Sequence, residues 1–420
     1  LHSFEREDAV SQNKSTPESV SIPSLVWLLG FVSLCMDLSS EMIYALLPVF
    51  LVSVLGASKL TLGVIEGIAE GTASIVKVFS GVISDRAAGR KPLVVFGYSL
   101  ATFSKPLFAL ANSAGWVLVA RFIDRLGKGI RGAPRDALIA DVTPAEVRGA
   151  AYGLRQALDT VGALLGPLAA IGLMIVFGGS MRHVFWVAVL PAVVAVGTLV
   201  VGVAEPERHL GGREKAVLPT WRDIRPLAGS YWFVVTIGAV FTLARFSEAF
   251  LIVRANQLGL AMNWTPLVLA VMNVTYVASA YPAGVLSDQI GRVSLLTIGL
   301  VMLIVADLIL ATTGSLYVVL LGAAVWGLHL GLTQGLLSAL VADTATVELR
   351  GTAFGVFNFV SGVAAILASI VAGAVWELWS PAATFYVGAI LSAIALGGLS
   401  WWWWRASQYR QKHADGEGEY

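Results

Sequence analysis

The feature that constrains this chain most is a series of long apolar runs. A helix that crosses the hydrocarbon core of a bilayer needs about 20 mostly apolar residues. Because lipid offers no hydrogen bonds to the backbone, each run must satisfy its own backbone groups, which predicts a helix. We therefore expect an all-α integral membrane protein with about twelve transmembrane helices. They are predicted near residues 24–54, 60–84, 92–112, 115–139, 147–177, 183–203, 229–256, 265–287, 293–313, 315–341, 350–377 and 381–404.

The composition supports this class and excludes others. The chain is 57% hydrophobic and 13% charged, with a mean hydropathy of +0.77, whereas soluble domains carry about 25% charged residues. The balance of 28 basic and 27 acidic residues gives no surface for nucleic acid. A single cysteine, Cys35, excludes an internal disulfide and a cysteine-cluster metal site. We expect the lipid bilayer as the surroundings, no nucleic-acid partner, no cofactor and no metal.

Polar stretches divide the chain into two sets of six helices. Residues 1–21 are expected to be a disordered tail, 22–204 the first bundle, 205–228 a linker, 229–405 the second bundle and 406–420 a second tail. The polar stretch from Glu205 to Pro226 lies at the midpoint and carries five basic residues. Basic residues also follow the second, fourth and twelfth helices, and such residues mark cytoplasmic loops. We therefore expect a protein of the cell inner (plasma) membrane with both termini and the linker in the cytoplasm.

An internal duplication is the strongest signal of organisation. The segment DVTPAEVRGAAYG at 141–153 matches DTATVELRGTAFG at 343–355, an offset of 202 residues (343 − 141). A second pair, GVISD at 81–85 and GVLSD at 284–288, lies 203 residues apart (288 − 85). Parallel halves of this kind place a substrate site at their interface, near the bilayer midplane.

Three segments of the first half resemble motifs of one family of transporters. GVISDRAAGRK at 81–91 is similar to the loop 2–3 signature of the major facilitator superfamily, with one inserted residue, and its second copy has Gln289 in the place of Arg86. Arg121-Phe-Ile resembles the helix-four arginine region of that family. Gly162-Ala-Leu-Leu-Gly166-Pro167 resembles the helix-five motif of its drug–proton antiporters. The resemblance covers about residues 22–405 and implies two pseudo-symmetric six-helix bundles that open alternately to either side.

Two of the motifs predict devices that control the opening. The residues of the loop 2–3 motif and its copy could form contacts in one arrangement of the bundles and lose them in the other, which would make a latch; the alternative is positive charge that only fixes orientation. Small residues four apart in the helix-five motif allow close helix approach, and Pro167 permits a bend; the alternative is simple packing. The latch candidates are Gly81, Asp85, Arg86, Arg90, Gly284, Asp288 and Arg292, and the helix-five candidates are Gly162, Gly166 and Pro167.

Ionisable residues inside the predicted helices are the candidates for a transport site, because a charge at mid-bilayer costs at least roughly 2.5–3.5 kcal/mol. A proton-coupled carrier needs buried carboxylates that a cation holds in only one state. The proton-coupling candidates are Asp37, Glu41, Glu66 and Glu70. The substrate-cavity candidates are Arg121, Asp124, Arg125, Asp159, Arg245 and Glu248. The alternative is a static ion-pair network, since the first half has seven such acids and eight such bases.

We interpret the chain as a secondary active transporter that moves a small solute, working as a monomer with protons as its coupling ion. Proton-coupled efflux of a small organic compound is the first hypothesis, and proton-coupled import of an organic anion is the second, which a stripe of arginines on the fourth helix favours. A membrane-embedded enzyme lacks a recognisable nucleophile or metal cluster, and a sensor lacks an output domain. A dinucleotide-type glycine pattern at 127–132 is rejected because it falls in a spanning helix, and His329 alone is read as packing.

Overall fold

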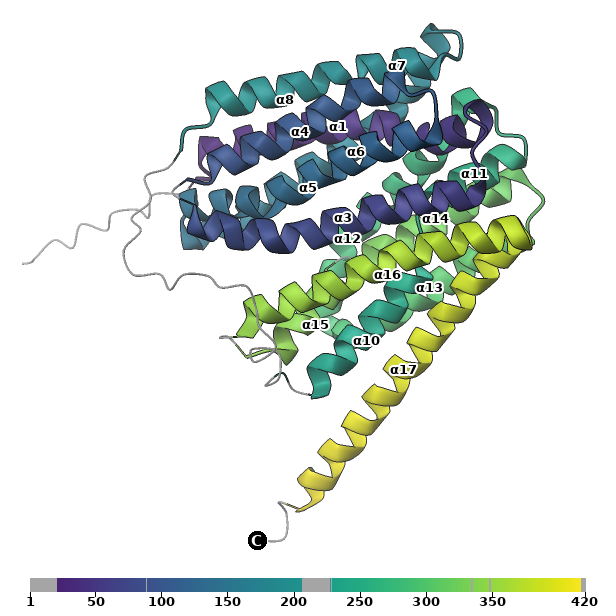
Figure 1. Cartoon of the computed structure of the whole chain (residues 1–420). Coiled ribbons are helices and arrows are strands. Elements are labelled where there is room, and N and C mark those ends of the chain that lie inside the picture. Colours follow the sequence, from purple (N-terminus) through teal and green to yellow (C-terminus); the bar gives the residue numbers. More distant parts are fainter. Residues whose placement is uncertain are drawn as a thin grey trace, which may run out of the picture.

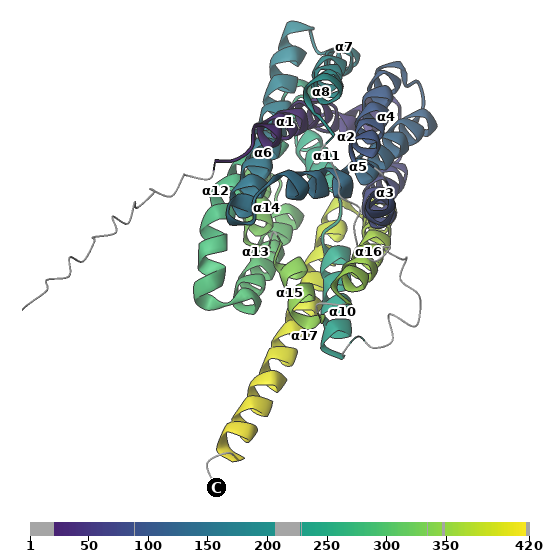
Figure 2. The same ribbon diagram turned by 90° about the vertical axis from the view of Figure 1, so that its left-hand side faces the viewer.

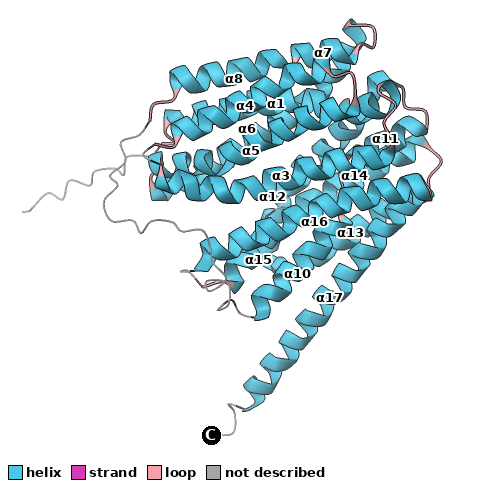
Figure 3. Ribbon diagram, viewed as in Figure 1, coloured by secondary structure: helices cyan, strands magenta, loops and turns pink. Residues whose placement is uncertain are grey.

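The chain forms an all-helical body in the computed structural model, which describes residues 21–87, 89–205, 227, 229–333, 335–346 and 349–416 (Figure 3). Within helices, the side chains of 288, 406–407 and 409–416 are outside this description. Most of the tail predicted for 1–21 and of the linker predicted for 205–228 also lies outside it. No strand occurs in the described ranges.

The first bundle ends with Gly202, and the second begins with Gly229. The helices of the first are α1 (Ser24–Tyr44), α2 (Leu47–Val49), a π-helical turn (Phe50–Val54), α3 (Lys59–Arg86), α4 (Lys91–Leu110), α5 (Ala114–Val142), α6 (Arg148–Val176), α7 (Met181–Val187) and α8 (Val189–Gly202). Those of the second are α10 (Gly229–Ala244), α11 (Ala249–Gln257), α12 (Leu267–Ile290), α13 (Arg292–Thr312), α14 (Leu316–Thr333), α15 (Leu336–Thr344), α16 (Arg350–Leu378) and α17 (Pro381–Gly416). Short 3₁₀ turns occupy Ala145–Val147 and Met262–Trp264.

Ten segments of the described chain are long and apolar enough to cross a membrane. Helices α3 and α5 are not among the ten, although they are 28 and 29 residues long. Both carry several charged side chains, which lowers their hydropathy but not their length. The ten spans together with these two helices give the predicted architecture of about twelve crossing helices in two sets. Helices α3 and α5 also carry most of the ionisable residues of the first bundle.

Four helices that the hydropathy predicts as continuous are interrupted, the sixth only at Ala188 between α7 and α8. The first breaks after Tyr44, because Pro48 has no N–H for the carbonyl of Tyr44 four residues earlier. The tenth breaks near Gly335, whose φ of 75° an L side chain rarely adopts. The seventh is non-helical at residues 245–248, where the Ser247 hydroxyl accepts a hydrogen bond from the Ala249 N–H at 3.2 Å. Such irregular backbone at membrane depth is tolerated where it is buried in protein or lines a cavity.

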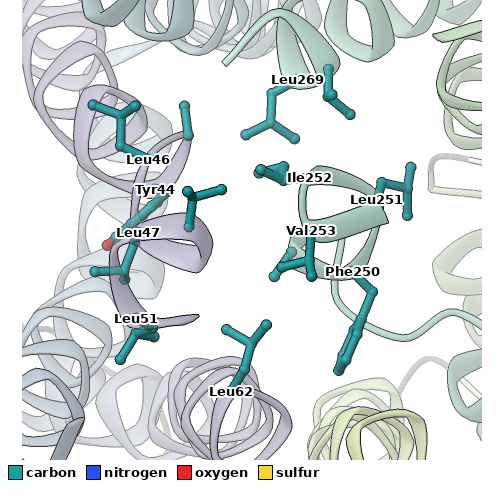
Figure 4. Close-up of a cluster of buried hydrophobic side chains, with 14 of the residues drawn as sticks. Tyr44, Leu46, Leu47, Leu51, Leu62, Phe250, Leu251, Ile252, Val253 and Leu269 are labelled. Atoms are coloured by element: carbon teal, nitrogen blue, oxygen red, sulfur yellow. The ribbon is translucent and has the colours of Figure 1, made fainter. Parts of the chain in front are cut away.

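The two bundles are in contact at one end of the molecule, which we call the closed end (right in Figure 1). A single apolar cluster there includes residues of both bundles, with Leu46, Leu47 and Leu51 facing Ile252 and Val253 of α11 (Figure 4). Beside it, α3 crosses α16 at very short range. A Cβ on Gly67 would lie 2.7 Å from the carbonyl oxygen of Ile366. Apolar packing and close backbone approach therefore seal this end.

At the opposite end, where α8 ends and α10 begins, the bundles are separate; we call this the linker end (left in Figure 1). The two remaining apolar clusters lie there, one within residues 26–203 of the first bundle and one within residues 227–399 of the second. Viewed from this end, the two bundles lie one above the other (Figure 2). The structure is thus open toward the linker end.

The duplication in the sequence is visible as a repeated ion pair. Arg90 binds Asp141 at 2.8 Å in the first bundle, and Arg292 binds Asp343 in the second. Both members of the second pair lie 202 residues after those of the first. The two halves therefore place equivalent residues in equivalent contacts.

Candidate functional site

A three-part cavity lies between the bundles. A central chamber of about 210 Å³ lies next to the closed end. A first-bundle lobe of about 510 Å³ and a second-bundle lobe of about 320 Å³ adjoin it. Glu70 lines all three parts, and Glu41 and Arg125 line both the chamber and the first-bundle lobe. The parts therefore form one continuous site rather than three separate pockets.

The chamber is crossed by ion pairs from α5 to α3. Arg121 Nη2 lies 2.6 Å from Glu66 Oε2, and Arg125 Nη2 lies 2.7 Å from Glu70 Oε1. Ser247, on the broken seventh helix of the second bundle, donates a hydrogen bond to Glu66 at 3.3 Å. Glu66 therefore joins the two bundles, whereas the side chain of Glu70 remains 43% exposed to the cavity.

A second group of charges is buried behind the chamber wall. Lys105 Nζ lies 2.8 Å from Asp124 Oδ1, and neither side chain is more than 3% exposed. Tyr44 donates a hydrogen bond to Asp124, and the Arg121 guanidinium stacks over the Tyr44 ring at 3.7 Å from its centroid. Lys105 also donates to Ser40 at 2.9 Å. This group ties α1, α4 and α5 together, and its buried pair is a structural element of the wall.

The third group lies along the first-bundle lobe. Arg155 binds both Asp136, at 3.0 Å, and Asp159. Arg135 binds Asp136 at 3.2 Å and lies 4.0 Å from Asp159. These side chains are only 12–29% exposed, and their two positive and two negative charges balance.

Two carboxylates stand outside these networks. Glu66, Glu70, Asp124, Asp136 and Asp159 are each paired with a base. Asp37 and Glu41 form no hydrogen bond or ion pair with any residue that the structure describes, although both line the first-bundle lobe. Lys128 and Arg131 line the same lobe and are likewise without a carboxylate partner among the described residues. The structure thus separates two of the four proton-coupling candidates, Asp37 and Glu41, from the paired Glu66 and Glu70.

The helix-five glycines lie directly against these two carboxylates. A Cβ on Gly162 would lie 2.6 Å from the Leu34 carbonyl oxygen and 3.2 Å from Asp37 Cβ, and a Cβ on Gly166 would collide with Glu41 Cβ. Helix α6 can therefore approach α1 this closely only because both positions are glycine. The motif holds the helix that carries Asp37 and Glu41 in place.

Pro167 has a partner in the second bundle. It has no N–H, so the Ala163 carbonyl one turn earlier has no donor within α6. Asn273 Nδ2, on α12, donates a hydrogen bond to that carbonyl at 2.9 Å. Pro167 therefore leaves the Ala163 carbonyl free to accept a hydrogen bond from the second bundle. Ala163 and Asn273 both line the chamber.

The latch candidates lie at the linker end. Arg90 binds Ser84 at 2.9 Å, Asp85 at 3.1 Å and Asp141, all within the first bundle. Backbone N–H groups of Arg90 and Lys91 donate to Glu205 at 2.7 and 2.8 Å. In the second copy Arg292 binds Asp343, while the Asp288 side chain lies outside the described residues. In this open arrangement the contacts of Arg90 with described residues stay inside one bundle, and their role as a latch remains a prediction.

All six substrate-cavity candidates line the cavity. Arg121 and Arg125 line the chamber, Asp124 and Asp159 the first-bundle lobe, and Arg245 and Glu248 the second-bundle lobe. The sequence reasoning did not find Tyr44, Ser247, Asn273 and Tyr276, which also line the chamber. Uncharged polar side chains are unremarkable in a hydropathy profile. The break in the seventh helix was the available signal for Ser247, because three polar residues interrupt an apolar run there.

Two bundles around a charged central cavity, open at one end, are the architecture of a membrane transport protein. The sequence model of the Major Facilitator Superfamily matches residues 29–273 and 249–419. The chain is 34% identical over 376 residues to the uncharacterized MFS-type transporter MJ1317 of Methanocaldococcus jannaschii, which covers 88% of this chain and 92% of the relative. The chain therefore belongs to the Major Facilitator Superfamily.

Two further comparisons are informative. The chain is 30% identical over 143 residues to the Multidrug resistance protein MdtH of Yersinia pestis, which covers 34% of this chain and 35% of the relative. The crystal structure of nucleoside transporter NupG superposes with a TM-score of 0.73 at 12% identity, over 90% of this chain and 98% of the other. The second likeness shows the fold alone, as a multi-pass membrane protein of two helical bundles.

Proposed function

We propose that this protein is a proton-coupled antiporter that exports a small organic compound by alternating access. The observation that carries the proposal is the pair Asp37 and Glu41. They are the two cavity-lining acids of the first half that have no basic partner among the described residues. The other cavity-lining acids of the first half already have the partners that a static network requires.

The coupling follows from the cost of burying a charge. In the open arrangement, water in the first-bundle lobe can hydrate the two carboxylates. Closing the linker end would remove that water and leave two unpaired charges in a low-dielectric site, which costs several kcal/mol per ion. This cost is removed either by the compound, which occupies the lobe while the loaded carrier closes the linker end, or by protons, which bind after the compound has left on the other side. The empty carrier therefore returns with protons bound. Proton entry thereby becomes linked to the outward movement of the compound.

The helix-five motif and one relative support export. Gly162 and Gly166 allow α6 to pack directly against Asp37 and Glu41 of α1. A change in the hydration of these two carboxylates would therefore alter the packing of α1 against α6. The motif resembles that of drug–proton antiporters, and MdtH, which matches about a third of the chain, is named a multidrug resistance protein. We further propose that the linker end faces the cytoplasm of a cell with the protein in its inner membrane, and that the monomer is the working unit. In this orientation the structure is open to the cytoplasm.

Import of an organic anion with protons is the second candidate. It requires cations that are free to hold an anion. Arg121 and Arg125 are each bound to a glutamate, whereas Arg245 lines the second-bundle lobe without a carboxylate partner among the described residues. This arginine, together with Lys128 and Arg131 of the first-bundle lobe, which also lack a carboxylate partner among the described residues, favours this alternative.

One experiment separates the two. A panel of drugs, siderophores, sugars and organic acids is screened for thermal stabilisation of the purified protein. A stabilising compound is then loaded into proteoliposomes that contain the pH dye pyranine, and the outside is diluted. An antiporter acidifies the lumen as the compound leaves, because protons enter in exchange. A symporter makes the lumen more alkaline, and efflux without a pH change contradicts proton coupling altogether.

Asp37→Asn and Glu41→Gln test the residues. Each should abolish the pH change while exchange of labelled for unlabelled compound continues, because exchange needs no return of the empty carrier. Glu146→Gln, which changes an exposed acid outside the cavity, is the matched control and should behave as the wild type. Unaltered proton movement in both cavity variants would show that the two carboxylates are not the coupling groups.

A further inference from the structure

One fully buried carboxylate of the second bundle has no partner in the part of the chain that the structure describes. Asp307, on α13, is 0% exposed, and neither of its carboxylate oxygens has a hydrogen-bond partner among the described residues. An ionised carboxylate without partners is very costly in such surroundings, whereas a protonated carboxyl is tolerated. An aspartate that served only for packing would be replaced by an apolar side chain at lower cost.

The surroundings of Asp307 are shaped to hold it beside an aromatic ring. A Cβ on Gly388 of α17 would lie 2.6 Å from Asp307 Oδ2 and 3.0 Å from Phe246 Cε1. The carboxyl and the Phe246 ring therefore lie side by side on the surface that Gly388 leaves free. The glycine provides the space that the carboxyl occupies.

Phe246 lies beside this carboxyl and also lines the cavity. It lines the second-bundle lobe, whereas Asp307 does not. It belongs to the non-helical segment 245–248 between α10 and α11, where backbone dihedral changes cost less than in a continuous helix. Its ring packs against Phe250, Trp326 and Phe385 at centroid distances of 5.5 to 5.7 Å. A shift of this segment would uncover Asp307 to the lobe.

Other titratable side chains near α13 are engaged elsewhere or lie apart. His329 of α14 has its Nδ1 2.7 Å from the Gly299 carbonyl, eight residues or about 12 Å along α13 from Asp307. Asp343 of α15 binds Arg292. On α12, Tyr276 lines the chamber and Tyr281 is exposed, and on α17 Tyr386 is exposed. Beyond Phe246, Arg245 and Glu248 face the lobe. No group of three His, Cys, Asp or Glu side chains forms within the described chain, so the chemistry favours a proton over a metal ion.

We propose that Asp307 is a second protonation site, located in the second bundle and separated from the cavity by Phe246. In the open arrangement the carboxyl keeps its proton. When the 245–248 segment moves, the O–H bond breaks, the proton passes to a water of the second-bundle lobe and a carboxylate remains. The role of this proton in the transport cycle rests on the proton-coupled function proposed above, but its presence does not.

Infrared difference spectroscopy of the protein in lipid nanodiscs tests the protonated state. A carboxyl without hydrogen-bond partners gives a carbonyl stretch at higher frequency than a hydrated one. We expect such a band at neutral pH in the wild type and its loss in Asp307→Asn, which has the shape of the neutral acid and should fold normally. Persistence of the band in Asp307→Asn, or its absence from the wild type, would overturn the proposal. A band that shifts on replacing potassium with sodium would identify a bound cation instead and would also overturn it.

Carbodiimide labelling tests the gate. Dicyclohexylcarbodiimide modifies protonated carboxyls in apolar sites, and peptide mass mapping separates Asp307 from Asp37 and Glu41. We expect severalfold more labelling of Asp307 in Phe246→Leu than in the wild type. Phe250→Leu is the matched control, since Phe250 belongs to the same aromatic cluster but does not line the lobe, and it should leave labelling unchanged. Equal labelling in the two variants would refute the gate. Neither readout uses transport, so failure of the antiport assay and failure of this site are distinguishable.

Discussion

The two bundles share a backbone plan and differ in how they carry charge. Both place an arginine after their second helix against an aspartate of their fourth, Arg90 with Asp141 and Arg292 with Asp343. The first bundle adds a dense set of ion pairs along the cavity, whereas the second faces the cavity mainly with Arg245 and Glu248 and buries Asp307 behind an aromatic ring. Duplication therefore preserved the frame, while the chemistry of the cavity developed mostly in one half.

The largest loss of stability is expected when one partner is removed from the buried ion-pair network of the first bundle. Lys105→Ala leaves Asp124 charged and buried, which should lower the free energy of unfolding by about 3–5 kcal/mol. The measurement is the apparent Tm and the yield of monodisperse protein in detergent. The double variant Lys105→Met/Asp124→Leu removes both charges and should recover much of the loss. A single variant as stable as the wild type would show that the pair does not support the bundle.

The repeated ion pair allows a direct comparison of the halves. Arg90 is 4% exposed and has three partners, so Arg90→Ala should cost about 1–3 kcal/mol. Arg292 and Asp343 are about half exposed, so Arg292→Ala should cost about 0–1 kcal/mol. Chemical denaturation of the two variants side by side measures the difference. Equal losses would mean that burial does not distinguish the two copies.

A smaller effect is expected at the contact between the bundles. Asn273→Ala removes the donor to the Ala163 carbonyl and should weaken the present arrangement by about 0.5–1.5 kcal/mol. Fluorescent labels at the linker end, read by single-molecule energy transfer, would report the population of the open state. Pro167→Ala restores a donor within α6, so adding Asn273→Ala to that background should have no further effect. An undiminished effect in the double variant would disprove the link between the proline and the asparagine.

Much of the fold could be predicted from the sequence. The apolar runs, the basic loops and the 202-residue repeat depend on local composition and chain order, and each indicates the twelve-helix, two-bundle plan. The breaks after Tyr44 and near Gly335 are also local, since they occur at a proline and a glycine. The interruption at 245–248 was less evident, because no proline or glycine marks it.

The candidate site could also be predicted only in part from the sequence. That ionisable residues concentrate in the first half, and that Asp37 and Glu41 share one helix face, followed from spacing alone. Which acids are paired could not be predicted, because an ion pair depends on how α3 and α5 are rotated and how closely they approach. The sequence placed Glu66 and Glu70 among the proton-coupling candidates together with Asp37 and Glu41, and only the tertiary contacts of Arg121 and Arg125 distinguish the two pairs.

The sequence by itself determined the solvent of this protein, its helices and its two-fold plan, because hydropathy and repetition are properties of the chain. The tertiary structure alone decided which end is sealed, which charges are neutralised and which carboxyl is hidden behind Phe246. The physical reason is the sequence distance over which each energy acts. The free energy of transferring a helix into lipid is a sum over neighbouring residues. The energy of a buried charge depends instead on the few atoms, distant in sequence, that lie within hydrogen-bond distance of it.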